Sequence, residues 1–165
     1  MSPPYMITSD ESLQIPQFSE GYRLRPIELA DYKRGALDVL KNLTTVGDIS
    51  REEFSELVKM WQRNPEIYHT YVIMNPLDKV VAIGSIIIEA KLIHHCGKVG
   101  HIEDIAVNSS EQGKRLGLSL IRYLLALGRK NGCYKVILDC DPANEGFYLK
   151  CGLSRAGYEM EYRFI

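Results

Sequence analysis

The sequence lacks an excess of charge of either sign: its 165 residues include 20 Lys and Arg against 21 Asp and Glu. This balance excludes a general attraction to nucleic acid or to an anionic membrane surface, although it leaves room for a local basic cluster. Long hydrophobic runs are also missing. The longest, residues 80–88, is interrupted by Gly84 and Ser85 and is too short to span a bilayer. The first residues have neither the basic flank nor the apolar stretch of a secretory signal, so we expect a cytoplasmic protein.

Paired cysteines and metal-ligand spacings are missing as well. The four cysteines, at positions 96, 133, 140 and 151, form no Cys-x-x-Cys pair, and we interpret them as reduced thiols packed as small hydrophobic side chains. His94, His95 and His101 together with Glu103 match no zinc-site spacing. We therefore predict no disulfide framework and no metal site.

The apolar residues that are present follow strand and helix periods and predict one mixed α/β domain over residues 21–165, after a loosely ordered arm over residues 1–20. The second helix begins at a capping box, Ser50 to Glu53, and Pro65 ends it. The expected elements, in order, are a strand at 22–27, helices at 29–43 and 50–64, strands at 68–74 and 79–89, a polar loop at 91–100, a strand at 101–107, a helix from 118 to Gly132, a strand at 134–140, a short helix from 142 to Gly152 and a last strand at 156–164.

The most informative segment is the loop at residues 108–117, Asn-Ser-Ser-Glu-Gln-Gly-Lys-Arg-Leu-Gly, between an expected strand and an expected helix. Free N–H groups and the dipole at a helix start favour a phosphate, and Lys114 and Arg115 add positive charge there. The glycine spacing matches neither a nucleotide-triphosphate loop nor a dinucleotide fingerprint. The loop alone is equally consistent with a surface turn whose basic side chains are only solvated.

Carboxylates inside apolar strands are the second signal. Glu103 and Asp104 are neighbours, so on a regular strand their side chains should leave opposite faces. Asp139 lies in the run Val-Ile-Leu-Asp-Cys. A carboxylate in such a place is costly unless it has a partner. These residues are therefore candidates for a polar site, although a solvated or structurally paired carboxylate would satisfy the same pattern.

A resemblance to a known superfamily begins at the loop. Gln112-x-x-x-x-Gly117, after the strand Asp104–Val107, resembles the coenzyme A loop of the GNAT superfamily of N-acetyltransferases, whose usual pattern is Arg/Gln-x-x-Gly-x-Gly/Ala. Arg115 departs from this pattern, because it stands where the first glycine is expected. Within the superfamily the chain is most similar to the eukaryotic glucosamine-6-phosphate N-acetyltransferases. The matching segments are residues 43–47, 87–89, 91–94, 100–109, 132–140, 144 and 146–148.

The resemblance implies a fold and an activity. The fold would be a mixed, mostly antiparallel sheet flanked by helices, with splayed central strands. The activity would be transfer of acetyl from acetyl-CoA to the 2-amine of glucosamine 6-phosphate by direct attack in a ternary complex, a step of UDP-N-acetylglucosamine biosynthesis. Acetyl-CoA would be the cosubstrate, and the enzyme would be a homodimer with the sugar site near the subunit interface.

The resemblance also implies roles for individual residues. Glu103, Asp139 and Tyr148 would be catalytic, with Asp139 orienting and deprotonating the amine and Tyr148 protonating the leaving thiolate. The main chain of a bulged strand would polarise the thioester carbonyl. The residues expected to contact the coenzyme are Ile105, Val107, Gln112, Gly113, Lys114, Arg115, Leu116, Gly117, Asn144 and Tyr148. The residues expected to contact the sugar phosphate are Thr44, Lys91, His94, Glu103, Asp104, Lys135, Asp139 and Arg163. In the family the last of these can come from the partner subunit, and the sequence leaves open which subunit supplies it.

Two alternatives to this function stay open on the sequence. One is another acetyltransferase of the same fold that acts on a peptide or polyamine amine, for which an acidic groove would suit better than the scattered cations. The other is a catalytically silent module that binds coenzyme A. The presence of Glu103, Asp139 and Tyr148 argues against the silent module, by resemblance.

Overall fold

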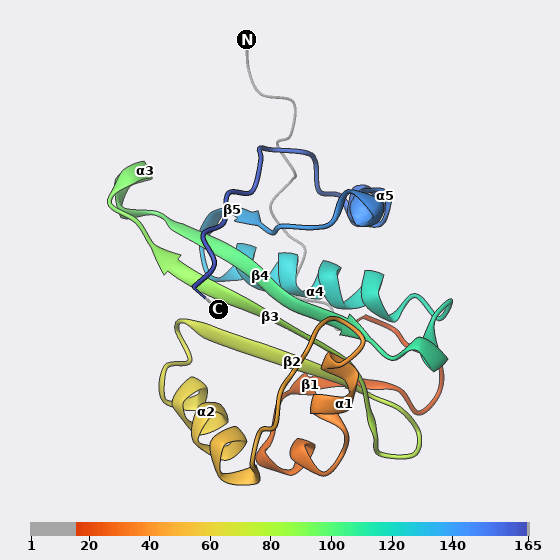
Figure 1. Cartoon of the computed structure of the whole chain (residues 1–165). Helices are drawn as coiled ribbons and strands as arrows, with labels where there is room; N and C mark the ends of the chain where they lie inside the picture. The colour runs from red at the N-terminus through yellow and green to blue at the C-terminus, as the bar shows by residue number, and fades with distance from the viewer. Residues whose placement is uncertain (1–15, 165) are drawn as a thin grey trace.

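A single five-stranded sheet organises the computed structural model, which describes residues 16–164 (Figure 1). The strands lie in the order β1-β2-β3-β4-β5. The first four are antiparallel, and β5 pairs with β4 in parallel. Their bounds are β1 Arg23–Pro26, β2 Tyr68–Met74, β3 Val80–Ala90, β4 Lys98–Val107 and β5 Cys133–Ile137.

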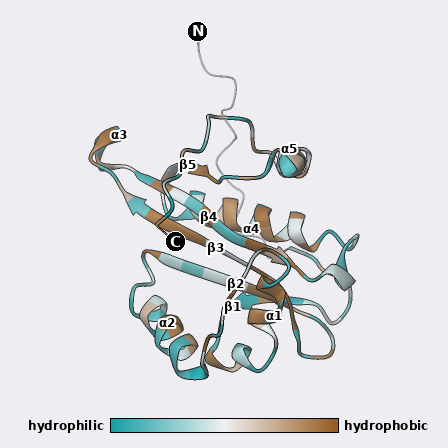
Figure 2. Ribbon diagram, in the orientation of Figure 1, coloured by the Kyte–Doolittle hydropathy of each residue, from teal (hydrophilic) through white to brown (hydrophobic). Residues whose placement is uncertain are grey.

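Helices cover both faces of the sheet, because the central strands are apolar on both sides. On β2, Ile73 belongs to the core under α4, whereas its neighbours Val72 and Met74 belong to the core under α1 and α2. Figure 2 shows this hydrophobicity concentrated along β3 and on α4. The helical segments are η1 Leu29–Tyr32, α1 Ala36–Leu40, α2 Arg51–Arg63, α3 Ile93–Cys96, η2 Ser109–Glu111, α4 Leu116–Lys130, η3 Pro142–Asn144 and α5 Glu145–Cys151.

The ladder between β3 and β4 contains a bulge. Ile83 pairs with Ala106 and Ser85 pairs with Glu103, so Asp104 and Ile105 together lie opposite Gly84. Asp104 has a left-handed backbone, with φ of 54°. A Cβ atom at position 84 would collide with Cδ1 of Ile105, so the glycine leaves room for this side chain of the bulged strand.

Strands β4 and β5 separate halfway along the sheet. Their parallel pairing runs from Lys98 and Cys133 to His101 and Ile137, while β4 continues to Val107 with no partner on that side among residues 16–164. This confirms the expected mixed sheet with splayed central strands. The opening between the two strands is where the candidate site lies.

Several expected elements differ from the structure. The single helix expected at 29–43 is two short segments: η1 has its C-cap at Lys33, and Gly35, with φ of 95°, is the N-cap of α1. The polar loop expected at 91–100 contains the helical turn α3, and β4 already begins at Lys98.

The strand expected at 156–164 is wrong for the described chain. That segment forms no sheet pairing with residues 16–164, and its aromatic side chains are exposed. Of the arm expected at 1–20, residues 1–15 lie outside the described residues, and Phe18 packs against the core under α4.

Candidate active site

Two adjoining cavities open where β4 and β5 separate. The larger, of about 1060 Å³, lies between the loop before α4, the end of β4 and α5. The smaller, of about 200 Å³, lies between the β4 bulge and the residues that follow β5. Leu43, Ile105 and Tyr148 line both, so these three residues mark the junction.

The N-terminus of α4 faces the larger cavity. The loop reaches it through two left-handed residues, Gly113 with φ of 84° and Arg115 with φ of 59°. Arg115 is the N-cap residue, and its side chain makes no capping hydrogen bond. The N–H groups of the first turn are therefore available to an anion, with the helix dipole adding to the attraction.

Arg115, which stands where the family pattern has a glycine, keeps the backbone conformation that a glycine would have. Position 115 has the left-handed conformation that glycine adopts most readily, so the arginine keeps the loop geometry at a conformational cost. Arg115 and Gly117 line the larger cavity, as do Gln112, Gly113 and Leu116. Lys114 does not line it: its ammonium is bound by Glu111 and by the hydroxyl of Tyr22.

Gly117 is required by packing as well as by the cavity. A Cβ atom there would lie 3.2 Å from Cζ of Phe147 and 3.4 Å from Cγ2 of Val107. The glycine therefore lets α5 approach the first turn of α4, and this approach holds Tyr148 at the junction of the cavities.

The bulge turns two carboxylates toward one cavity. Glu103 and Asp104 both line the smaller cavity, together with Asp139. The expectation that Glu103 and Asp104 leave opposite faces is wrong, because the left-handed backbone at Asp104 breaks the regular alternation of the strand. Burial raises the pKa of the Glu103 carboxyl, and the charges of Asp104 and Asp139 raise it further, with His101 acting in the opposite sense.

Tyr148 is the titratable group at the junction. It lies on α5, which follows η3 and begins after Asn144. Burial raises the pKa of the Tyr148 phenol, so the hydroxyl stays protonated across the neutral range. Its ring lies edge-on to that of Phe147, with 5.0 Å between the ring centroids. The site thus places a carboxylate of raised pKa and a protonated phenol beside an anion-binding helix start.

Known proteins are similar to this chain in both sequence and fold. Residues 36–153 match the Acetyltransferase (GNAT) family. Glucosamine 6-phosphate N-acetyltransferase of Candida albicans is 55% identical over 145 residues, which cover 88% of this chain and 97% of that protein. The chain belongs to the GNAT acetyltransferase family.

Other relatives agree with this membership. Glucosamine 6-phosphate N-acetyltransferase 1 of Dictyostelium discoideum is 40% identical over 142 residues, covering 86% of this chain and 90% of that protein. The crystal structure of glucosamine-6-phosphate N-acetyltransferase from Arabidopsis thaliana superposes with a TM-score of 0.86 at 37% identity, covering 88% of this chain and all of that one. GNAT acetyltransferases take their acetyl group from acetyl-CoA. Within residues 16–164, no helix has the length and hydrophobicity needed to cross a membrane.

The residues expected in this GNAT acetyltransferase divide into two groups. All the expected coenzyme residues except Lys114 line the larger cavity, and Glu103, Asp104 and Asp139 line the smaller one. The remaining substrate residues line neither cavity: Thr44, Lys91, His94, Lys135 and Arg163.

The cations of this second group have local partners instead. Lys91 Nζ lies 2.7 Å from a carboxylate oxygen of Glu89, and the ring of His94 lies 4.1 Å from that of Tyr134. Lys135 lies over the same tyrosine, and Arg163 donates to Glu161. Thr44 follows Leu43, which does reach the cavities.

Several lining residues were not among the expected site residues. Asn42 and Leu43 come from the loop after α1, and Phe147 and Leu138 close the walls near α5 and β5. Leu43 could have been found from the sequence, because it is an apolar residue directly before a Thr-Thr breaker. In the structure its side chain is about half exposed. Phe147 looks like an ordinary core residue, and its position depends on the contact with Gly117.

Proposed function

We propose that this chain transfers acetyl from acetyl-CoA to the 2-amine of D-glucosamine 6-phosphate, giving N-acetyl-D-glucosamine 6-phosphate and CoA. The reaction is a direct attack in a ternary complex, and it serves the synthesis of UDP-N-acetylglucosamine. The observation that carries the proposal is Tyr148 at the junction of the two cavities, between a phosphate-binding helix start and a group of three carboxylates. The names of the relatives support the choice of amine.

The larger cavity suits the coenzyme. A pyrophosphate needs N–H donors and positive potential, which the start of α4 and Arg115 offer. The pantetheine arm fits along the unpaired edge of β4 at Ile105 and Val107, where main-chain groups have no partner from β5. The thioester would then lie at the junction, beside Tyr148 and the bulge.

The smaller cavity suits an aminosugar. Its three carboxylates attract an ammonium group, and the raised pKa of Glu103 makes its carboxylate a better proton acceptor than that of an ordinary glutamate. Glu103 takes a proton from the ammonium, while Asp139 orients the amine. The nitrogen attacks the thioester carbon, and N–H groups at the bulge stabilise the oxyanion. The C–S bond breaks as Tyr148 protonates the sulfur, and the nitrogen of the new amide gives its extra proton to the Tyr148 phenolate, which restores the phenol.

The phosphate of the sugar needs a cation from elsewhere. No described residue that lines the smaller cavity is positively charged, whereas a phosphate is normally held by Arg or Lys. The C-terminal segment offers a source. Tyr158, Met160, Tyr162 and Phe164 alternate along it and are all more than 80% exposed. Such an uncovered apolar row suits pairing with a second copy, and Arg163 would then enter the partner's sugar site.

A kinetic panel tests the substrate assignment. Release of the CoA thiol from acetyl-CoA is measured with glucosamine 6-phosphate, glucosamine, spermidine and a peptide amine. We expect glucosamine 6-phosphate to be preferred over glucosamine by at least about tenfold in kcat/KM, because charge-assisted contacts to the phosphate contribute ~1.5–3 kcal/mol. Equal rates with free glucosamine would refute the assignment of the phosphorylated sugar as substrate. The absence of thiol release with every amine would refute an acetyltransferase activity.

A further inference from the structure

Three side chains close a hydrogen-bonded triangle behind the loop that precedes α4. The hydroxyl of Tyr22 donates to Oε2 of Glu111 over 2.8 Å. Nζ of Lys114 donates to the same oxygen over 2.5 Å and to the tyrosine hydroxyl over 2.7 Å. The ammonium also lies 5.2 Å from the centroid of the tyrosine ring. The catalytic steps described above use none of these three groups.

Glu111 is the buried centre of this triangle. It ends η2, directly before the loop, and only 8% of its surface is exposed. The hydrogen bond from Lys114 is the largest of the interactions that lower the pKa of its carboxyl, and Tyr22 and Asn75 contribute further hydrogen bonds. A charged carboxylate buried at this level is stable only with such partners.

The triangle ties the loop to a distant part of the chain. Tyr22 directly precedes β1, and its neighbour Gly21 packs against Pro76 in the turn between β2 and β3. Glu111 itself lines the larger cavity, as do the next two residues, Gln112 and Gly113, whereas Lys114 does not. Fixing positions 111 and 114 therefore fixes the exit of the loop into the left-handed residue Arg115 and the start of α4.

We propose that Tyr22, Glu111 and Lys114 act as a positioning triad for the coenzyme loop. The triad holds the N–H groups at the start of α4 in place for the pyrophosphate, and Lys114 acts through Glu111 and Tyr22 without touching the phosphate. This inference rests on the proposed coenzyme site. A loop that is already ordered binds its ligand more tightly, because it loses less conformational entropy on binding.

The sharpest test removes one hydroxyl. Tyr22→Phe keeps the ring and deletes the donor to Glu111 and the acceptor for Lys114. We expect the dissociation constant for CoA, measured by calorimetry, to rise about three- to tenfold, the range that one hydrogen bond contributes. The KM for the sugar phosphate and kcat at saturating acetyl-CoA should change less than about twofold, since the loop holds only the coenzyme.

Tyr32→Phe is the matched control. It deletes a tyrosine hydroxyl that donates to the carbonyl of Ile49 over 3.1 Å, on the α1 and α2 side of the sheet. It should cost comparable thermal stability and leave CoA binding unchanged. If both variants weakened CoA binding equally, the effect of Tyr22→Phe would be a general loss of stability, and the proposal would be overturned.

Lys114→Met separates positioning from direct phosphate binding. If the three residues act as a triad, Lys114→Met weakens CoA binding. The double variant with Tyr22→Phe should then bind CoA about as weakly as the weaker of the two single variants, because both changes break the same network. With a direct contact, Lys114→Met weakens binding while Tyr22→Phe does not, which overturns the proposal. Wild-type protein that fails to bind CoA would instead refute the coenzyme site itself.

Discussion

At Asp104 one left-handed residue turns two adjacent carboxylates to the same cavity, and the charge of Asp104 then raises the pKa of Glu103. As a base, Glu103 works only when ionised, so kcat/KM falls as the pH drops through its pKa. Asp104→Asn removes one of the charges that raise this pKa, so the acid limb of kcat/KM should move to lower pH. The movement should be partial, because burial is the larger cause. An acid limb that stays in place or moves upward in a pH–rate profile would contradict Glu103 as the base.

Tyr148 is tested by removing its hydroxyl alone. A thiolate leaves readily, so general-acid help should be small, and we expect Tyr148→Phe to lower kcat by about 100-fold or less. Its phenyl ring should keep the packing against Phe147, so CoA affinity should survive. Since burial raises the pKa of the phenol, wild-type activity should persist to alkaline pH and then decline as the phenol ionises. The variant should lose that decline, whereas an unchanged kcat and pH profile would make Tyr148 a packing residue.

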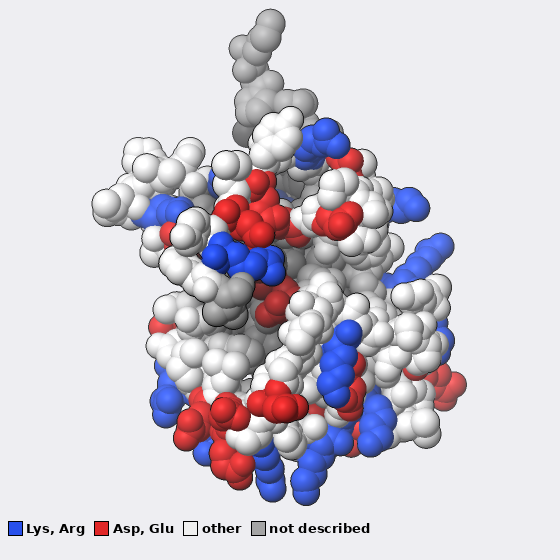
Figure 3. All heavy atoms as spheres, viewed as in Figure 1, with Lys and Arg blue, Asp and Glu red and all other residues white. Residues whose placement is uncertain are grey.

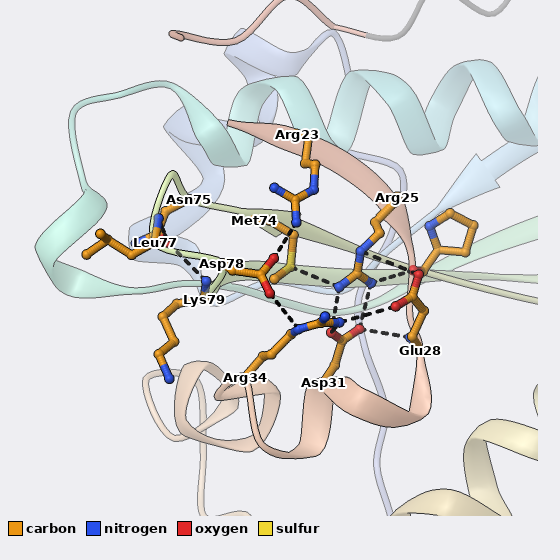
Figure 4. Close-up of polar contacts among 11 residues, drawn as sticks. Arg23, Arg25, Glu28, Asp31, Arg34, Met74, Asn75, Leu77, Asp78 and Lys79 are labelled. Carbon is orange, nitrogen blue, oxygen red and sulfur yellow. Dashed lines mark hydrogen bonds and ion pairs between the residues drawn. The ribbon is translucent and has the colours of Figure 1, made fainter. Parts of the chain in front are cut away.

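At the scale of elements, a cluster of ion pairs fixes β1 against η1 and the β2–β3 turn (Figure 4). The carboxylate of Asp31 is fully buried and accepts two bonds from Arg25, of 2.7 and 2.6 Å. It also accepts one from the backbone N–H of Glu28. Arg34 joins this pair to Asp78, which in turn binds Arg23. The cluster holds the edge strand from outside the candidate site.

Asp31→Asn tests this cluster. The substitution leaves Arg25 without its bidentate acceptor, and we expect it to lower the free energy of unfolding by ~2–4 kcal/mol. Asp38→Asn is the matched control: Asp38 pairs with Lys41 on the exposed surface of α1, and its loss should cost less than about 1 kcal/mol. Urea unfolding measures both. Equal costs would show that burial adds nothing to the Asp31 pairs.

The elements also show what the sequence could predict. The capping box at Ser50 is a local pattern, and the structure confirms it together with the strands expected at 68–74 and 79–89. The bulge at Asp104 is not local, because it arises in the pairing of β4 with Ile83 and Ser85 of the neighbouring strand. The same applies to Phe147, which packs close to Gly117 from another helix. The loop before α4 was predictable from its own residues as a turn between a strand and a helix, whereas the direction of the two carboxylates was not.

At the scale of the whole molecule, the described chain has a face on which apolar side chains of the C-terminal segment are exposed. Figure 3 shows acidic and basic side chains close together on this face. The charge of Glu159, from the C-terminal segment, contributes to the raised pKa of Glu103, so this segment lies near enough to affect the site. The apolar residues that alternate with Glu159, Glu161 and Arg163 have no cover from residues 16–164. An exposed row of this kind is stable in water when a second copy covers it.

Arg163 tests whether that second copy completes the site. Arg163→Ala should raise the KM for glucosamine 6-phosphate about 10- to 100-fold and leave the KM for acetyl-CoA nearly unchanged, because only the sugar carries the phosphate that Arg163 would meet. Lys150→Ala, which removes a cation beside the larger cavity, is the control and should leave the KM for the sugar phosphate unchanged.

A subunit-mixing experiment then decides which copy supplies the arginine. In assays at sugar phosphate concentrations well below the KM, homodimers of Arg163→Ala and homodimers of Glu103→Gln should each show little activity. In a mixed dimer, a site with Glu103 from one copy and Arg163 from the other is intact if the arginine acts across the interface. Random mixing makes half of the dimers mixed, and each holds one intact site of two, so about a quarter of the wild-type activity should return. If Arg163 acts within its own subunit, one site of every mixed dimer lacks Arg163 and the other lacks Glu103, and no activity returns. A monomeric protein in sedimentation, or mixing without recovery, would therefore contradict the shared site.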